Sequence, residues 1–358
     1  MTTPVATTTE TQRARVIPTR GVRFRWSDVA IAGLAAEIPQ VSRTTSEIED
    51  RLRPLYKRLG LKPGWVEAVT GIGARRLWPQ DDRYLSGAVR AARRAMFEAG
   101  VRADELQVVV STSVYKDRLE PSLACEVQGE LGIGSTCTSF DLGNACLGFL
   151  NGMATVANMI ALGQVHAGLV VSAEDAGPVL EATLSSLLGP QATIQHFRDH
   201  LATLTLGSAA CAAVLVRGAG PMMLRGGATL SATDQRELCM GDARGMQTDG
   251  VKLLREGVAL AARTWAEATD TLSWTTPDIG CFALHQVGKA HHEAILRQLA
   301  LPADRAPQIY PWMGNIGSCG VPVTAILARD QGLARAGDPG VWMGIGSGLN
   351  CMMLGTGA

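Results

Sequence analysis

Short apolar runs alternate with stretches of helical periodicity along the first part of the chain. The runs are largely bounded by Gly, Ser or Asp, as buried strands are. Predicted strands cover residues 29–34, 106–111, 168–172 and 209–216. Between them, residues 45–59 show the spacing of an amphipathic helix, because apolar side chains recur every three or four positions. This alternation predicts an α/β protein with a covered, mostly parallel sheet.

The same alternation returns in the second part of the chain. Predicted strands cover residues 222–230, 279–284, 341–345 and 351–354, and predicted helices cover residues 251–268 and 321–329. The pairs Gly143-Asn144 and Gly314-Asn315 each precede a helical run of small and apolar residues, which is consistent with two related halves. Gly-Asn pairs also occur by chance at turns, so a duplication stays one of two interpretations. Residues 178–206 are predicted to be an insertion that covers the first half.

The composition excludes a disordered chain and favours a small-molecule partner. The chain has 358 residues, of which 46% are hydrophobic and 18% charged, so it is long enough for two domains or one two-part unit. Its 33 basic and 33 acidic side chains cancel, and a balanced charge gives no overall field that would attract nucleic acid or an anionic membrane. The most apolar region, residues 145–172, is interrupted by Asn, Gln and His, so we expect no membrane span.

The cysteines and the N-terminal residues indicate the compartment. Eight cysteines stand at positions 125, 137, 146, 211, 239, 281, 319 and 351, with no CxxC pair and no close Cys/His pair. That spacing argues against a disulfide framework and against a zinc site, so we expect reduced thiols and no metal. Residues 1–26 contain five arginines but not the apolar core of a signal peptide. We expect a cytoplasmic protein in which residues 1–26 form a flexible arm, with a docking arm as the alternative.

Residues 138–163 contain the strongest local signal for chemistry. A predicted strand runs into the Gly143-Asn144 turn, and Cys146 follows at the start of a helix of small and apolar residues. A thiol at a helix N-terminus meets unpaired N–H groups and the positive end of the helix dipole, which lower its pKa and favour the thiolate. Neighbouring backbone N–H groups can also hold an oxyanion. Cys146 is therefore a candidate nucleophile, and the alternative is a buried structural cysteine.

Three further polar residues complement this thiol. His285 directly follows a predicted strand, a position at which α/β proteins gather ligand contacts. Asn315 lies in a glycine-rich turn before a helix, and Glu120 precedes a proline just past a strand. The His and Asn N–H groups can stabilise an enolate or an oxyanion, and Glu120 can act as a general base. Taken singly, His285 is equally a core residue, Asn315 a turn former and Glu120 a solvated loop residue.

The segment TGIGARRLW is a candidate for nucleotide recognition. Arg75 and Arg76 are suited to grip a phosphate and Trp78 to stack on a base, although an ordinary surface ion pair is the alternative. Two other runs do not match the ligand-binding motifs that they suggest. The His-His-Glu run at 291–293 lacks the second histidine of a zinc-binding helix, and the glycines at 344–348 precede a strand rather than the helix of a dinucleotide fingerprint.

Taken in order, these segments resemble a known family. Asn-Ala-Cys146 opens a buried helix and is followed by His285-Gln-Val, by Gly-Asn315 and by a closing GIGSGLN. This series resembles the thiolase superfamily in its β-ketoacyl-ACP synthase III branch, which has a Cys-His-Asn triad. The stretches RLRPLYKRLG, TGIGARRLW, TSVYKDRLEPS and DLGNACLGFLNGM are similar to the OleA group, the long-chain acyl-CoA condensing enzymes of olefin and β-lactone biosynthesis. The resemblance covers residues 29–354.

The resemblance implies a fold and an assembly. The fold is the thiolase fold, with two similar βαβαβαββ halves in a five-layered α-β-α-β-α arrangement, normally in a homodimer. The N-terminal half would be residues 27–218, which carry the nucleophile and the base. The C-terminal half would be residues 219–358, which carry the histidine and the asparagine.

The resemblance also implies a role for each candidate residue. Cys146 would take the acyl group from one long-chain acyl-CoA, and Glu120, reaching across the dimer interface, would remove an α-proton from a second. His285 and Asn315 would stabilise the enolate, while backbone N–H groups of Cys146 and the Ser347 region would hold the oxyanion. The product would be a 2-alkyl-3-ketoacyl thioester, released as the β-keto acid, with coenzyme A thioesters as substrates and no cofactor. The residues that would contact coenzyme A are Arg75, Arg76 and Trp78.

Glu120 separates this activity from ordinary chain elongation. Decarboxylation of a malonyl donor generates its own carbanion, whereas an unactivated acyl-CoA must lose an α-proton to a positioned base. Three alternatives stay open. The first is a decarboxylative synthase III that uses malonyl-ACP, and the second is one subunit of a heterodimeric condensing enzyme. The third is a cysteine peptidase, for which the papain-like signature around the nucleophile is missing.

Overall fold

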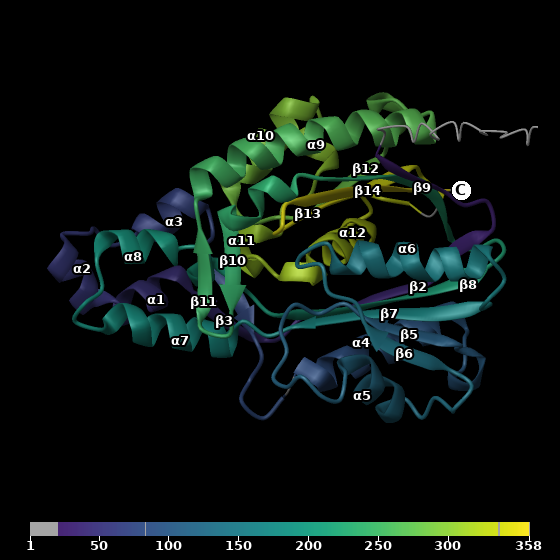
Figure 1. The fold of residues 1–358 in the computed structure, drawn as a ribbon, viewed down its shortest axis with the longest axis horizontal. Coiled ribbons are helices and arrows are strands. Elements are labelled where there is room, and N and C mark those ends of the chain that lie inside the picture. The colour runs from purple at the N-terminus through teal and green to yellow at the C-terminus, as the bar shows by residue number, and fades with distance from the viewer. Residues whose placement is uncertain (1–20, 83, 336, 358) are drawn as a thin grey trace, which may run out of the picture.

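The computed structural model describes residues 21–82, 84–335 and 337–357. These residues form five layers in the order helix, sheet, helix, sheet, helix (Figure 1). Each sheet is covered by helices on both faces. That explains why strands such as Ala167–Glu174 are buried at every position rather than at alternate ones.

Five strands form the sheet of the first half. They are β2 (Val29–Glu37), β5 (Val108–Ser111), β6 (Thr138–Asp141), β7 (Ala167–Glu174) and β8 (Ala209–Arg217). Their order across the sheet is β2-β8-β7-β5-β6. β5 is parallel to β6 and β7, and β8 is antiparallel to β7 and β2. Residues that follow β5, β6 and β7 therefore meet at one edge of the sheet.

The second half repeats this arrangement with fewer strands. Its strands are β9 (Met222–Ser231), β12 (Cys281–Leu284), β13 (Gly340–Gly346) and β14 (Asn350–Gly357). The order β12-β13-β14-β9, with one parallel and two antiparallel pairs, matches β5-β7-β8-β2. Among the described residues of this half, no strand corresponds to β6. The repeated order favours the duplication interpretation of the Gly-Asn pairs.

The two sheets meet along a short seam. Ala30 and Ile31 of β2 pair with Met223 and Met222 of β9, which makes the hydrogen-bonded path continuous from one sheet to the other.

Helices fill the space between the sheets and cover their outer faces. α6 (Gly148–Ala161) and α12 (Gly320–Asp330) lie in the middle layer. α4 (Tyr84–Ala99) and α5 (Leu123–Glu130) cover the first sheet, while α9 (Gly250–Leu272) and α10 (Lys289–Leu299) form the outer layer of the second. The middle helices are buried on nearly every side, so they consist of small and apolar residues and not of an amphipathic pattern.

A helical lobe extends from one end of the layers, on the left in Figure 1. Its helices are α1 (Thr45–Arg51), α2 (Arg53–Leu59), α3 (Trp65–Thr70), α7 (Gly177–Leu188) and α8 (Ile194–Asp199). The predicted insertion, residues 178–206, thus packs against α1 to α3 in an apolar cluster that includes Leu55, Leu184 and Phe197. The single helix predicted over residues 45–59 is wrong. It is two helices that meet at Leu52, because Pro54 fits only the first turn of a helix.

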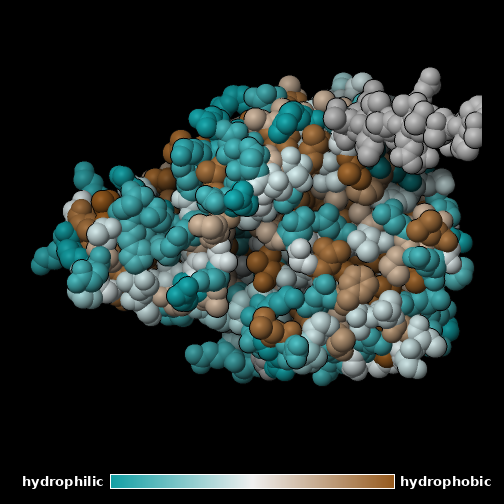
Figure 2. Space-filling view, in the orientation of Figure 1, coloured by the Kyte–Doolittle hydropathy of each residue, from teal (hydrophilic) through white to brown (hydrophobic). Residues whose placement is uncertain are grey.

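Short strand pairs connect the lobe to the layers. β3 (Val41–Thr44) pairs with β4 (Ala74–Leu77), and β10 (Cys239–Asp242) pairs with β11 (Gly245–Thr248). A one-turn helix, α11 (Tyr310–Met313), precedes the Asn315 turn. In the orientation of Figure 2, hydrophilic side chains dominate the surface of the lobe.

The end of the predicted flexible arm is ordered. β1 (Val22–Arg25) pairs antiparallel with β9, and Arg23 forms ion pairs with Glu267 and Asp270 of α9. Trp26 is buried, and its Nε1 donates a hydrogen bond to Asn158 at 2.9 Å. The prediction of an arm over residues 1–26 is therefore wrong for its last residues, because their apolar side chains are used in the second sheet and the core. Residues 1–20 lie outside the described residues.

None of the helices in the described residues is long and apolar enough to cross a membrane. All eight cysteines are free thiols.

Candidate active site

Cys146 lies in a tight turn between β6 and α6. Ala145, the residue before it, has a φ of +46°, a left-handed conformation that is uncommon for a residue with a side chain. The turn is closed by hydrogen bonds from the N–H groups of Leu147 and Gly148 to the carbonyls of Asn144 and Ala145, at 3.0 Å each. The backbone thereby holds the thiol at the start of α6, and strain of this kind is typical of functional turns.

The predicted effect on the thiol is wrong in sign. Burial raises the pKa of Cys146, and the nearby Glu174 and Cys239 raise it further. The favourable contacts at the start of α6 do not outweigh the cost of placing a thiolate in a site from which water is largely excluded. Cys146 is a neutral thiol in this state, so a base must take its proton when it reacts.

His285 follows β12 and presents a neutral imidazole to the cavity. It is 9% exposed, and burial together with His291 lowers its pKa to about 4, so the imidazole is neutral at pH 7. A Cβ added to Gly320 would lie 2.7 Å from the Nδ1 atom, which shows how closely the ring packs against the start of α12. Nδ1 is buried there without a partner among the described residues. Nε2 is therefore the ring nitrogen left for chemistry.

Asn315 is held rigidly in its turn. Its backbone N–H donates to the carbonyl of Thr205 and its carbonyl accepts from Gly207, both at 2.9 Å. Its side-chain Oδ1 accepts from the N–H of Gly317 at 3.0 Å. This bond fixes the orientation of the amide and leaves its NH₂ group as a donor.

These three residues meet in one cavity. Cys146, His285 and Asn315 line a space of about 230 Å³ together with Ser347. Most other wall residues are apolar, including Leu253 and Leu349. The structure thus brings together, from segments far apart in the sequence, a thiol, a neutral imidazole and an amide in surroundings that suit an alkyl chain.

The glycine-rich close of the chain approaches the nucleophile turn. A Cβ added to Gly346 would lie 3.2 Å from the amide nitrogen of Leu147 and 3.4 Å from that of Cys146, so this glycine packs closely against the nucleophile turn. Asn350 ties the two segments, since its Nδ2 donates to Oδ1 of Asn144 and to the carbonyl of Ser347, at 3.3 Å each. The backbone near Ser347 therefore lies beside that of Cys146, as the predicted oxyanion site requires.

Glu120 does not line this cavity. It lies in an exposed segment between β5 and α5, and its carboxylate makes no hydrogen bond or ion pair with the described residues. Its neighbour Leu119 is 90% exposed and Val114 is 52% exposed. Within one chain, the candidate base and the candidate nucleophile are not brought together.

The predicted coenzyme A contacts disagree with the structure in two of three cases. Arg75 is fully buried, and its guanidinium donates to the carbonyls of Leu204 and Arg43 and to the hydroxyl of Thr45. Trp78 is buried and donates to the carbonyl of Glu174 at 2.9 Å. These side chains hold the lobe and the sheet together, so neither reaches a ligand. Arg76 is half-buried and lies over the ring of Trp312.

A wider cavity of about 810 Å³ adjoins the active-site cavity and shares Thr70, Leu201 and His291 with it. Two exposed cations, Arg198 and Lys289, line its wall.

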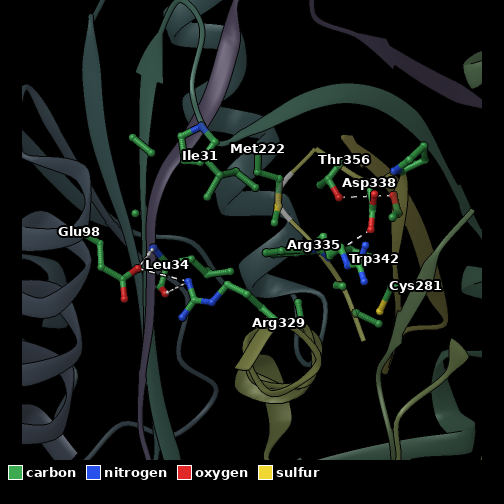
Figure 3. Close-up of a pocket in the computed structure, with 18 residues that line it drawn as sticks. Ile31, Leu34, Glu98, Met222, Cys281, Arg329, Arg335, Asp338, Trp342 and Thr356 are labelled. Atoms are coloured by element: carbon green, nitrogen blue, oxygen red, sulfur yellow. Dashed lines mark hydrogen bonds and ion pairs between the residues drawn. The ribbon is translucent and has the colours of Figure 1, made fainter. Parts of the chain in front are cut away.

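A third cavity, of about 260 Å³, lies elsewhere (Figure 3). Its lining includes Ile31, Met222 and Trp342, and at one side Arg329 pairs with Glu98. None of the candidate catalytic residues lines it, so its size alone does not make it the active site.

Comparison with known proteins decides the family. Residues 140–232 match the family 3-oxoacyl-(acyl carrier protein) synthase III, and residues 270–354 match its C-terminal part. The chain is 40% identical to the acyl-CoA:acyl-CoA alkyltransferase of Shewanella oneidensis over 347 residues, which cover 93% of this chain and 99% of that protein. The crystal structure of Xanthomonas campestris OleA is 38% identical, covers 93% of this chain and 99% of its own, and superposes with a TM-score of 0.89.

The chain belongs to the OleA family of acyl-CoA condensing enzymes.

Other OleA structures bear on the ligand. One of the Xanthomonas campestris protein has bound lauric acid and lauroyl-CoA, and it matches this chain with the same identity, coverage and TM-score. A protein from Xanthomonas oryzae with the name 3-oxoacyl-(acyl carrier protein) synthase III is 39% identical and covers 94% of this chain and 100% of its own, with a TM-score of 0.89. The predicted thiolase fold and OleA-type family are confirmed.

The sequence did not reveal several residues of this OleA-type site. Cys239 lines the cavity and accepts a hydrogen bond from the Ser347 hydroxyl at 3.1 Å. His292 also lines it, and both of its ring nitrogens are buried without a partner in the described part of the chain. Glu174 is buried, does not line the cavity, and is near enough to Cys146 to raise the pKa of its thiol. The sequence gives one signal for Glu174, because an acidic residue that ends a fully buried strand is unusual. It gives no signal for Cys239 or His292.

Proposed function

We propose that this protein catalyses the non-decarboxylative head-to-head Claisen condensation of two fatty acyl-CoAs through an acyl-Cys146 intermediate. The product is a 2-alkyl-3-ketoacyl-CoA thioester, which water hydrolyses to the β-keto acid and free coenzyme A. The observation that carries the proposal is the meeting of Cys146, His285 and Asn315 in one largely apolar cavity that opens into a wider entrance.

In the first half-reaction, Cys146 attacks the carbonyl carbon of a fatty acyl-CoA. Because the thiol is neutral, Nε2 of His285 takes its proton as the bond forms, and the imidazolium then protonates the departing coenzyme A thiolate. Backbone N–H groups of Cys146 and the adjacent Ser347 region hold the tetrahedral oxyanion. The acyl chain lies along the apolar wall of the cavity.

In the second half-reaction, Glu120 removes an α-proton from a second acyl-CoA. The fixed amide of Asn315 donates a hydrogen bond to the enolate oxygen that forms, and His285 donates a second one once its neutral ring is in the Nε2–H tautomer. The carbanion attacks the acyl-Cys146 thioester and the bond to sulfur breaks. The Cys146 thiolate then takes up the proton that Glu120 removed, which restores both the thiol and the carboxylate. Coenzyme A thioesters are the substrates, and the proposal includes no cofactor.

For the base to reach the cavity, the proposal places Glu120 in the active site of a second subunit. Exposed apolar side chains rarely flank an exposed carboxylate on a free surface, and Leu119 beside Glu120 is 90% exposed. A homodimer that buries this segment covers Leu119 and delivers Glu120 to the partner cavity. The compartment we propose is the cytoplasm.

We further propose that Arg198 and Lys289 attract the phosphates of coenzyme A, in place of Arg75 and Trp78. Both are exposed in the wall of the entrance cavity. Lys289 is only loosely paired, at 3.9 Å from Glu293, so its ammonium is free to meet a phosphate.

The test is to incubate the purified protein with one long-chain acyl-CoA and no malonyl donor. Mass spectrometry should detect acyl-Cys146 and the condensed β-keto acid or its ketone. Cys146→Ala should form neither species, and Glu120→Ala should form only the acyl-enzyme. Condensation that appears only after a malonyl thioester is added would instead identify a decarboxylative synthase. Condensation that requires a related second protein would identify one subunit of a heterodimer.

A further inference from the structure

A single buried carboxylate connects the loops of the proposed site. Glu174 is the last residue of β7, is 6% exposed and does not line the active-site cavity. Its Oε1 accepts hydrogen bonds from the N–H groups of Val114 at 3.0 Å and Ser318 at 3.1 Å. Its Oε2 accepts one from the N–H of Tyr115 at 3.0 Å. No cation of the described chain pairs with it, so backbone N–H groups alone compensate its charge.

The segments that Glu174 holds both carry groups of the condensation step. Val114 and Tyr115 begin the exposed segment that leads to Glu120. Ser318 lies three residues after Asn315, in the same turn. A Cβ added to Gly317, which has a φ of +53°, would lie 3.0 Å from the Glu174 carboxyl carbon. This turn therefore rests directly on the carboxylate.

Ser318 extends the connection to the nucleophile. Its hydroxyl oxygen accepts a hydrogen bond from the N–H of Phe149 in the first turn of α6 at 2.9 Å, and the hydroxyl donates to Thr112 at 3.3 Å. Through these bonds, the start of the Cys146 helix, the Asn315 turn and the Glu120 segment share one buried polar cluster. Such networks fix relative positions because every member is satisfied only in one arrangement.

We propose that Glu174 is a positioning residue of the condensation step, which anchors the Asn315 turn of its own active site and the segment that carries Glu120 to the partner subunit's site. The inference rests on the proposed function and deepens it. Burial raises the pKa of Glu174 to about 7, and the three N–H donors act against that rise. A carboxylate buried in the core without a counter-cation destabilises the fold. A role in positioning the two segments explains why the protein has one here.

The two half-reactions respond differently to the loss of this charge. Acylation needs Cys146 and His285, neither of which Glu174 holds. The negative charge of Glu174 also raises the pKa of Cys146, so its removal does not oppose ionisation of the thiol. Condensation needs Glu120 and Asn315, whose segments both lose an anchor.

The test compares Glu174→Gln with Glu49→Gln. Glu49 is a matched control because it is also 6% exposed and accepts hydrogen bonds from Gly64, Val66 and the Tyr56 hydroxyl, but it lies in the lobe. In Glu174→Gln, the NH₂ end of the amide replaces one carboxylate oxygen. It cannot accept a hydrogen bond from the backbone N–H groups that face it. We expect condensation to fall about tenfold to a hundredfold, while acyl-Cys146 forms as in the wild type and accumulates.

The ratio of condensation to acylation is the decisive readout, since a structural defect lowers both rates together. Glu49→Gln should lower the melting temperature and leave the ratio unchanged. Gly317→Ala, which pushes a methyl group against the Glu174 carboxylate, should lower the ratio in the same way and keeps the inference testable if Glu174→Gln fails to fold.

Two results separate the inference from the proposed function. A wild-type protein that condenses acyl-CoA, beside a Glu174→Gln variant with an unchanged ratio, overturns the role of Glu174 alone. A wild-type protein that forms no condensed product overturns the proposed function, and the inference with it.

Discussion

The two halves of the molecule build the same turn at the same place and use it differently. In the first half, Gly143-Asn144 leads into the middle helix α6, and Asn144 is engaged in structure, since its Nδ2 donates to Asn151 at 2.7 Å and its Oδ1 accepts from Asn350. In the second half, Gly314-Asn315 leads into the middle helix α12, and Asn315 lines the cavity. In the first half, both ends of the asparagine amide are used in structural hydrogen bonds. In the second half, the described residues use only the oxygen, so the NH₂ group of the asparagine is left as a donor.

This difference assigns separate tasks to the halves. The first half presents the thiol two residues after its asparagine, whereas the second half presents the asparagine itself beside His285. In the proposed mechanism, covalent chemistry and hydrogen-bond donation therefore come from two copies of the same turn. Substitutions in one turn should therefore abolish either acylation or hydrogen-bond donation to the enolate, and not both.

The largest effect is expected from Cys146→Ala. Loss of the only sulfur in the nucleophile turn should reduce acylation and condensation more than about a thousandfold, because no other group forms the thioester. Intact-protein mass spectrometry after exposure to a long-chain acyl-CoA measures the acyl-enzyme. Cys125→Ser, at an exposed cysteine, is the matched control and should acylate normally. A persistent acyl adduct in Cys146→Ala would move the nucleophile elsewhere.

Asn315→Ala should lower condensation about a hundredfold, because one fixed donor to the enolate oxygen is lost. Acyl-enzyme formation should change little. Asn144→Ala tests the other turn and should mainly destabilise the fold, by about 1–3 kcal/mol, since its partners are left unsatisfied. Rates of each half-reaction and denaturant unfolding separate these outcomes. Equal losses of condensation in the two variants would show that the turns are not specialised.

Arg75→Met should destabilise the protein by about 3 kcal/mol, because the carbonyl of Leu204 and its neighbours lose a buried donor. The KM for acyl-CoA of the folded fraction should stay unchanged. Arg198→Ala, in the entrance cavity, should show the reverse, with normal stability and a raised KM. A raised KM in Arg75→Met would restore the first assignment of the coenzyme A contacts.

The smallest effect concerns acid stability. Burial lowers the pKa of His285 to about 4, below its ordinary 6.5. As the pH falls through this window, the unfolded chain binds the proton first, so the stability due to neutral His285 is present above 6.5 and lost toward 4. Between pH 7 and pH 5, the free energy of unfolding should therefore fall by about 2 kcal/mol less in His285→Asn than in the wild type. Parallel unfolding curves at the two pH values would contradict the lowered pKa.

The sequence allowed most buried strands to be predicted, and it singled out the three candidate residues Cys146, His285 and Asn315 that line one cavity. Strands covered on both faces must be apolar throughout, and that pattern is visible in residues 209–216 without coordinates. β1 was missed because it is short and partly exposed. The state of Cys146 was predicted wrongly because desolvation depends on the whole surrounding fold, whereas the helix start is local. The burial of Arg75 escaped prediction for the same reason.

β1 also constrains the order in which the chain assembles. Residues 22–25 precede both halves in the chain, yet their strand partner in the described residues is β9, which belongs to the second half. Because N-terminal units generally fold first during synthesis, the first sheet forms while this strand still waits unpaired. We therefore expect β1 to pair, and Trp26 to become buried, only after both halves have folded.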